Sequence, residues 1–161
     1  MVEIYTFVWL LDMDLSQFLV QAKRATYASG DESKEIREKD SSKSLFYRQW
    51  DWLYHDNYLG SRYFGGREVV FWQQKPVWMM VYYGGVVSDE VNPGEVYKFL
   101  QQALQKVSED ALFRGPREFQ DGSWHYVNDF EGDISSFRWV EKIWFDKKLV
   151  YQGRYGGGKI E

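Results

Sequence analysis

The chain has 161 residues, a formal net charge of −4, two histidines and no cysteine. This length suits one domain, residues 1–161, with a core of its own. The lack of cysteine excludes disulfides and thiolate metal sites. We expect no cofactor and no metal, since two histidines are too few for a histidine-rich site.

The distribution of charge and hydropathy argues against nucleic acid and membranes as binding partners. The 20 basic residues are scattered rather than gathered in a stripe, so we expect no direct binding of nucleic acid. No run of 18 apolar residues is present, and we expect no membrane association. The first residues lack the basic and small-residue features of a signal peptide, which favours a cytoplasmic protein.

The first third of the chain predicts an arm, a helix and a polar connection. The N-terminal arm, residues 1–13, is rich in β-branched and aromatic residues. Asp14 and Gln17 have the spacing of a capping box, and apolar residues follow at helical spacing from Leu15 to Ala25. We expect this helix to stop near Ala28. Residues 29–44 are almost all polar or charged. We interpret them as a solvated loop, the alternative being a lid over a site.

The middle of the chain predicts antiparallel strands. Residues 52–58 alternate in the way strands do, and glycines 60, 65 and 66 mark a turn after them. Residues 68–73 and 76–84 then predict a hairpin joined near residues 74–75.

A second helix and a second set of strands follow. Asn92 and Pro93 have the sequence of an N-cap followed by proline at the first helical position. A stripe of apolar residues continues to Val107. Asp121-Gly122 predicts a further turn, and more strands are expected from there to residue 158.

Two stretches of the chain share one skeleton. Aromatic and glycine positions in residues 52–85 match those in 124–158 after a one-residue insertion, and Glu68 matches Glu141. A fixed period predicts internal duplication, with repeat one at 14–87, including the charged loop 29–44, and repeat two at 92–158. We therefore predict an α+β fold, an internal duplication of one helix plus three or four antiparallel strands. Its two helices would pack on antiparallel sheet with pseudo-two-fold symmetry.

Acidic side chains among aromatic ones form the candidate site. An aromatic ring attracts a cation and a carboxylate supplies the counter-charge, so this face of the strands could bind a cationic or aromatic molecule. The competing interpretation is that the glutamates are structural, and it is favoured for both. For Asp56 the structural and the ligand-binding interpretations are equally favoured. The matching position of the second repeat is Asn128, so the charge itself is not needed for folding. The candidate ligand-binding residues are Trp52, Tyr54, Asp56, Tyr58, Glu68, Trp78, Tyr82, Glu141 and Tyr151.

Several motifs in order give the chain a family resemblance. They are residues 18–28 (FLVQAKRATYA), Tyr54-x-Asp56-x-Tyr58-x-Gly60, Gly66-x-Glu68, Pro76-Val77-Trp78-x-Met80-x-Tyr82-x-Gly84, Arg114-Gly115-Pro116 and Tyr155-x-Gly157. With them the chain resembles domain-of-unknown-function family 5680 over about residues 15–158. The resemblance implies a prokaryotic domain that occurs alone or behind a helix-turn-helix module of the Xre type. It implies no chemistry, and this chain has no such module.

These observations predict a non-catalytic small-molecule-binding or sensor module. A protein-interaction module, for instance a homodimer, is the first alternative, because aromatic residues are abundant. The second is a hydrolase that uses Asp56 with Glu68, or the two glutamates, as acid and base.

Overall fold

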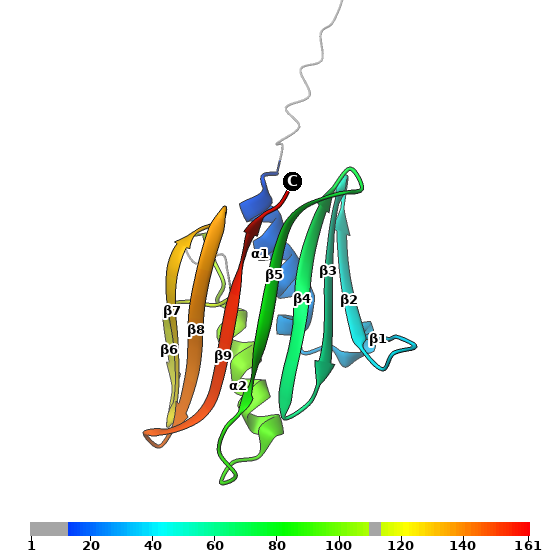
Figure 1. Cartoon of the computed structure of the whole chain (residues 1–161). Coiled ribbons are helices and arrows are strands. Elements are labelled where there is room, and N and C mark those ends of the chain that lie inside the picture. Colours follow the sequence, from blue (N-terminus) through cyan, green and yellow to red (C-terminus); the bar gives the residue numbers. More distant parts are fainter. Residues whose placement is uncertain (1–12, 110–113) are drawn as a thin grey trace, which may run out of the picture.

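The computed structural model describes residues 13–109 and 114–161, which form one nine-stranded antiparallel sheet and two α-helices (Figure 1). The strand order is β1-β2-β3-β4-β5-β9-β8-β7-β6. The α-helices are α1 (Leu15–Ala25) and α2 (Pro93–Leu104), and two 3₁₀ turns, η1 (Tyr27–Ser29) and η2 (Glu32–Lys34), follow α1. The strands are β1 (Ile36–Arg37), β2 (Lys43–Gln49), β3 (Trp52–Gly60), β4 (Tyr63–Trp72), β5 (Lys75–Val86), β6 (Glu118–Asp121), β7 (Trp124–Asp133), β8 (Ser136–Phe145) and β9 (Lys148–Lys159).

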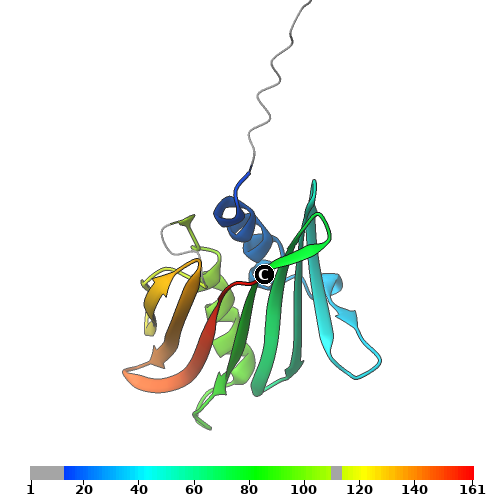
Figure 2. The same cartoon turned by 45° about the horizontal axis from the view of Figure 1, so that its top comes forward.

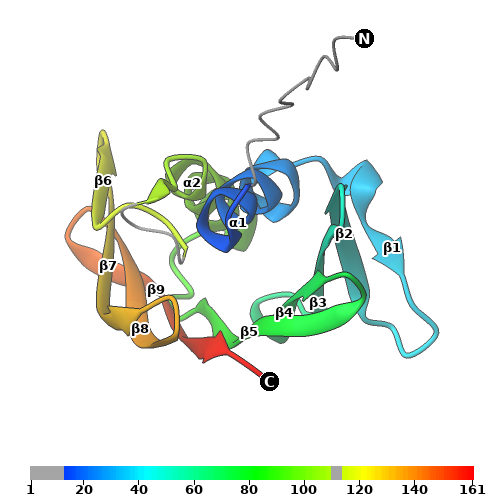
Figure 3. The ribbon, with the colours of Figure 1, turned by 90° about the horizontal axis from the view of Figure 1, so that it is seen from above.

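The sheet is bent into a trough. Seen from above, its strands surround α1 and α2, which lie on the concave side (Figure 3). The inclined view shows the same arrangement (Figure 2). Within residues 13–109 and 114–161 the convex side of the sheet carries no helix, and the core lies between the concave face and the two helices.

The predicted fold class is wrong. The nine strands form one continuous sheet, and the helices are only 11 and 12 residues long. The protein is thus mostly sheet, and it is not built from separate units of one helix on three or four strands. The long central strands β5 and β9 pair from Trp78↔Lys159 to Val86↔Tyr151, so the hydrogen-bonded ladder runs through the middle of the molecule. Neither the α+β label nor the internal repeat is supported by this arrangement.

The helix starts were predicted correctly. Asp14 accepts a hydrogen bond from the Gln17 N–H at 2.8 Å, and the Gln17 side chain accepts one from the Asp14 N–H, which completes the capping box. Asn92 caps α2 by accepting from the Gly94 N–H, and Pro93 is the first helical residue. Helix α1 ends at Ala25, earlier than predicted, and η1 continues the chain to Ser29. The predicted arm at 1–13 falls almost entirely outside the described residues.

One turn differs from its prediction. The turn between β3 and β4 is tight, at residues 61–62, and Gly65 and Gly66 lie within β4 rather than in the turn. Gly66 is needed where the sheet is crowded, because a Cβ there would lie 2.4 Å from the Asn57 carbonyl oxygen and 2.7 Å from the hydroxyl of Tyr82. This glycine therefore makes room for the neighbouring strand β3 and for a tyrosine side chain instead of reversing the chain.

Candidate functional site

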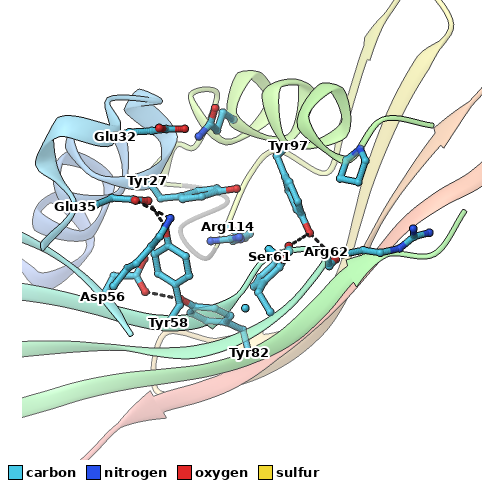
Figure 4. Close-up of a pocket in the computed structure, with 15 residues that line it drawn as sticks. Tyr27, Glu32, Glu35, Asp56, Tyr58, Ser61, Arg62, Tyr82, Tyr97 and Arg114 are labelled. Carbon is cyan, nitrogen blue, oxygen red and sulfur yellow. Dashed lines mark hydrogen bonds and ion pairs between the residues drawn. The ribbon is translucent and has the colours of Figure 1, made fainter. Parts of the chain in front are cut away.

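A cavity of about 380 Å³ opens on the concave side of the sheet. It lies between α2, the segment with η1 and η2, and strands β3, β4 and β5, in the size range of small-molecule pockets. Figure 4 shows the side chains that line it. They are Tyr27, Glu32, Glu35, Lys43, Asp56, Tyr58, Gly60, Ser61, Arg62, Phe64, Tyr82, Pro93, Tyr97, Gln101 and Arg114.

Aromatic rings form the walls. Tyr58 and Tyr82 point up from β3 and β5, while Tyr97 comes down from α2 (Figure 4). The rings of Tyr27 and Tyr58 meet edge to face, with centroids 6.3 Å apart. The hydroxyl of Tyr97 donates to the carbonyl oxygens of Ser61 and Arg62, each at 2.7 Å, which fixes that ring in place. The walls are therefore preorganised by their own packing.

Asp56 supplies a buried carboxyl at the cavity. Strand β3 alternates between its two faces, and this places Asp56 on the concave face, opposite Glu68 of β4. Asp56 is 2% exposed, and its Oδ1 accepts a hydrogen bond from the Tyr82 hydroxyl. Burial, together with the nearby charge of Glu68, raises the pKa of Asp56 to about 7, while the Tyr82 bond and two cations oppose the shift.

Arg114 brings a buried guanidinium to the same cavity. It lies in the segment between α2 and β6, and its side chain lies between Tyr27 and Tyr82 (Figure 4). The Cζ atom lies over the rings of Tyr27, Tyr82 and Tyr155 at 5.6, 5.6 and 4.9 Å. Burial disfavours its charge, but Tyr155 and Glu141 outweigh that effect and raise its pKa. Its Nε has no hydrogen-bond partner among residues 13–109 and 114–161.

Two buried glutamates lie behind the cavity. Arg114 Nη1 is 3.8 Å from Glu68 Oε1, and Arg114 Nε is 3.6 Å from Glu141 Oε1. Glu68 also accepts a hydrogen bond from the ammonium group of Lys23, which descends from α1. Burial lowers the pKa of Lys23, and the charge of Glu68 opposes that shift. Each glutamate thus has a cationic neighbour, as a buried carboxylate requires.

Glu141 is held by three tyrosines. The hydroxyls of Tyr126 and Tyr151 donate to it at 2.9 and 2.7 Å, and that of Tyr155 donates as well. Space for these hydroxyls comes from Gly153, where a Cβ would lie 2.5 Å from the Tyr155 oxygen. Because three hydroxyl groups already donate to the Glu141 carboxylate, its bonding favours a structural role over ligand binding.

The polar segment 29–44 lines one side of the cavity. It contains η2 and β1, and its residues Glu32 and Glu35 line the opening. Glu35 forms an ion pair with Lys43 at 2.9 Å and accepts a hydrogen bond from the Tyr58 hydroxyl. The segment is thus bonded to the wall of the cavity at this point.

The structure divides the nine predicted site residues into two groups. Asp56, Tyr58 and Tyr82 line the cavity. The others lie on the concave side in the core or beside it: Trp52, Tyr54, Glu68, Trp78, Glu141 and Tyr151. Trp78, for example, is fully buried and donates from Nε1 to the Ile134 carbonyl at 3.1 Å.

Sequence reasoning missed the cavity residues that lie outside the strands, among them Tyr27, Tyr97 and Arg114. Tyr27 and Tyr97 could have been suspected as aromatic residues on or just after the predicted helices. Arg114 gave one signal, its place in an Arg-Gly-Pro motif, but nothing in the sequence indicated that the side chain points inward.

Comparison with known proteins identifies the family. The family model described as a domain of unknown function, DUF5680, matches residues 56–160. The chain belongs to this family. The DUF5680 match begins at Asp56 and includes Arg114 and Glu141, so it covers most of the buried charges described above. No curated protein and no solved structure matches the chain.

Two features are absent from the described part of this DUF5680 protein. Within residues 13–109 and 114–161, no helix has the length and hydropathy to cross a membrane. The same residues contain no group of three or more His, Asp or Glu side chains placed to hold a metal ion.

Proposed function

We propose that this protein is a non-catalytic small-molecule-binding module. One observation carries the proposal: the cavity places a buried carboxyl, Asp56, and a buried guanidinium, Arg114, beside a ring of aromatic side chains. Pockets with apolar walls and a few polar groups in fixed positions are typical of ligand sites.

The polar groups at the cavity are incompletely bonded. Among the described residues, the hydroxyl of Tyr82 is the one hydrogen-bond donor to Asp56. Arg114 meets its two glutamates only at 3.6 and 3.8 Å, beyond ordinary hydrogen-bond distance. Since buried polar groups are costly when unpaired, a ligand that bonds to them would gain both affinity and orientation.

The arrangement gives less support to hydrolysis. An acid–base pair needs two carboxyl groups that reach the substrate. Of the three carboxyls buried in the described part of the chain, only Asp56 lines the cavity, while Glu68 and Glu141 are bonded to other side chains. Two further carboxyls, Glu32 and Glu35, also line the cavity, but Glu35 is paired with Lys43 and accepts a hydrogen bond from the Tyr58 hydroxyl.

Blocking the cavity tests the proposal. Gln101 of α2 lines the cavity, whereas Gln102 beside it is exposed to solvent. Gln101→Trp should fill the opening, and Gln102→Trp is its matched control. A fragment library observed by ligand-detected NMR should give hits that bind wild type and the control and lose binding to Gln101→Trp. No hits, or hits that Gln101→Trp leaves unchanged, would contradict the proposal.

A dimerisation module is the second candidate, and the convex face supplies its supporting observation. Leu59, Tyr63, Val81 and Tyr83 are each half or more exposed there. Two of these rings already have a local role, because Tyr83 lies against Gly65 and Tyr63 against Gly85. Light scattering at micromolar concentration tests this candidate: a dimer supports it and a monomer contradicts it.

A further inference from the structure

The charges around the cavity fall into pairs with one carboxyl left over. Among residues 13–109 and 114–161, five charged side chains are buried here: the carboxyls of Asp56, Glu68 and Glu141, and the cations of Lys23 and Arg114. If all are ionised, the cluster carries one excess negative charge. The question is which carboxyl lacks a cation of its own.

The contacts assign the first pair to Lys23 and Glu68. Their side chains are in direct contact and are 6% and 1% exposed. The pair has no net charge whether the proton lies on the nitrogen or has moved to the carboxylate. The net charge of the buried cluster therefore does not depend on the lowered pKa of Lys23.

Arg114 and Glu141 make the second pair. The guanidinium lies 3.6 Å from Glu141, and it remains charged because its pKa is raised. Its position between Glu141 and Glu68 means that its charge is already balanced. A bound anion would meet a cluster that contains more carboxyls than cations, so Arg114 is poorly suited as an anion receptor.

Asp56 is the carboxyl left over. In the part of the chain that the structure describes it forms no ion pair, and its bonded partner is the neutral hydroxyl of Tyr82. At the mouth, Lys43 pairs with Glu35 and Arg62 pairs with Asp89. Glu32 then adds a second excess negative charge at the opening.

We infer that the ligand of this cavity is an organic cation whose positive group lies against Asp56 and whose apolar body lies between the tyrosine rings. This inference rests on the proposed function and names the class of molecule. The ligand would supply the missing positive charge. The tyrosine faces would attract it further, as aromatic cages attract ammonium groups.

Three probes of similar size test the charge preference: benzyltrimethylammonium, benzyl alcohol and benzoate. Isothermal titration calorimetry at about pH 7.5 should show that wild type binds the cation at least roughly tenfold more tightly than the neutral alcohol, with benzoate weakest. Gln101→Trp should abolish binding of the cation.

Two aspartate variants test whether the charge of Asp56 causes the preference for a cation. Asp56→Asn should lose most of the preference for the cation over the alcohol. Asp129→Asn makes the same change at an exposed position on β7, outside the cavity, and should leave the preference intact.

The outcomes separate the inference from the proposed function. If the probes bind, Gln101→Trp blocks them, and the cation has no advantage in wild type, the inference is overturned while the binding module stands. If no probe and no library fragment binds in the cavity, both fail. The comparison in wild type decides the charge preference even if Asp56→Asn does not fold.

Discussion

At the scale of single residues, the proposed binding of a cation depends on Asp56. It is a carboxyl buried beside Glu68 with one bonded tyrosine, and the groups that face it from neighbouring elements are Glu68, Tyr82, Lys23 and Arg114. Desolvation is the largest effect on its pKa, and the two cations reduce that effect without removing it. Asp56 therefore changes its charge close to neutral pH.

The first prediction concerns stability and pH. The pKa of Asp56 is about 7 in the folded protein against an ordinary value of 3.8, so the folded state binds this proton more tightly than the unfolded state. The resulting stabilisation is fully present below about pH 4 and is lost as the pH rises to about 7. Urea unfolding should show wild type losing stability relative to Asp56→Asn over that range, by on the order of 4 kcal/mol. A constant difference would contradict the assigned pKa.

The second prediction concerns the buried pair of Lys23 and Glu68. Lys23→Met leaves Glu68 without its bonded cation, and the free energy of unfolding should fall by about 3–5 kcal/mol. Adding Glu68→Gln removes the stranded charge, so the double variant should be more stable than Lys23→Met alone. Chemical denaturation measures the free energy of unfolding of both variants and shows which is the more stable. A double variant that is less stable than the single one would show that the pair is not the reason for the loss.

At the scale of elements, the turns give the third prediction. Gly60 has a φ of +100°, and a Cβ there would lie 2.1 Å from the Tyr63 carbonyl oxygen, whereas Gly122 has a φ of +57° and open space around it. Gly60→Ala should cost about 3 kcal/mol, from strain and crowding together, and Gly122→Ala about 1 kcal/mol. Thermal unfolding of both variants provides the comparison. Equal losses would mean that crowding at the β3–β4 turn is unimportant.

Local signals explain which elements could be predicted. The caps at Asp14 and Asn92 and the alternation along β3 act within a few residues, so the sequence contains them in full. The prediction for Gly66 was wrong because the sequence does not distinguish a glycine in a turn from one that makes room for a neighbouring strand and for Tyr82. That distinction depends on a strand partner that is distant in the sequence.

At the scale of the whole molecule, the fold class was predicted wrongly because the decisive contact is long-range. The pairing of β5 with β9 joins the two halves into one trough, and no periodicity in either strand indicates it. The candidate site was predicted in part for a similar reason. Alternation identified Asp56, Tyr58 and Tyr82, but Arg114 reaches the cavity from a connection whose direction only the folded chain defines.

The most direct test is to count protons when a cation binds. Titration calorimetry of benzyltrimethylammonium at about pH 6, in two buffers of different ionisation enthalpy, reports the number released. With its pKa at about 7, Asp56 is mostly protonated at this pH and must ionise to pair with the ligand. We predict release of most of one proton per site from wild type and none from Asp56→Asn. Cation binding to wild type without proton release would contradict it.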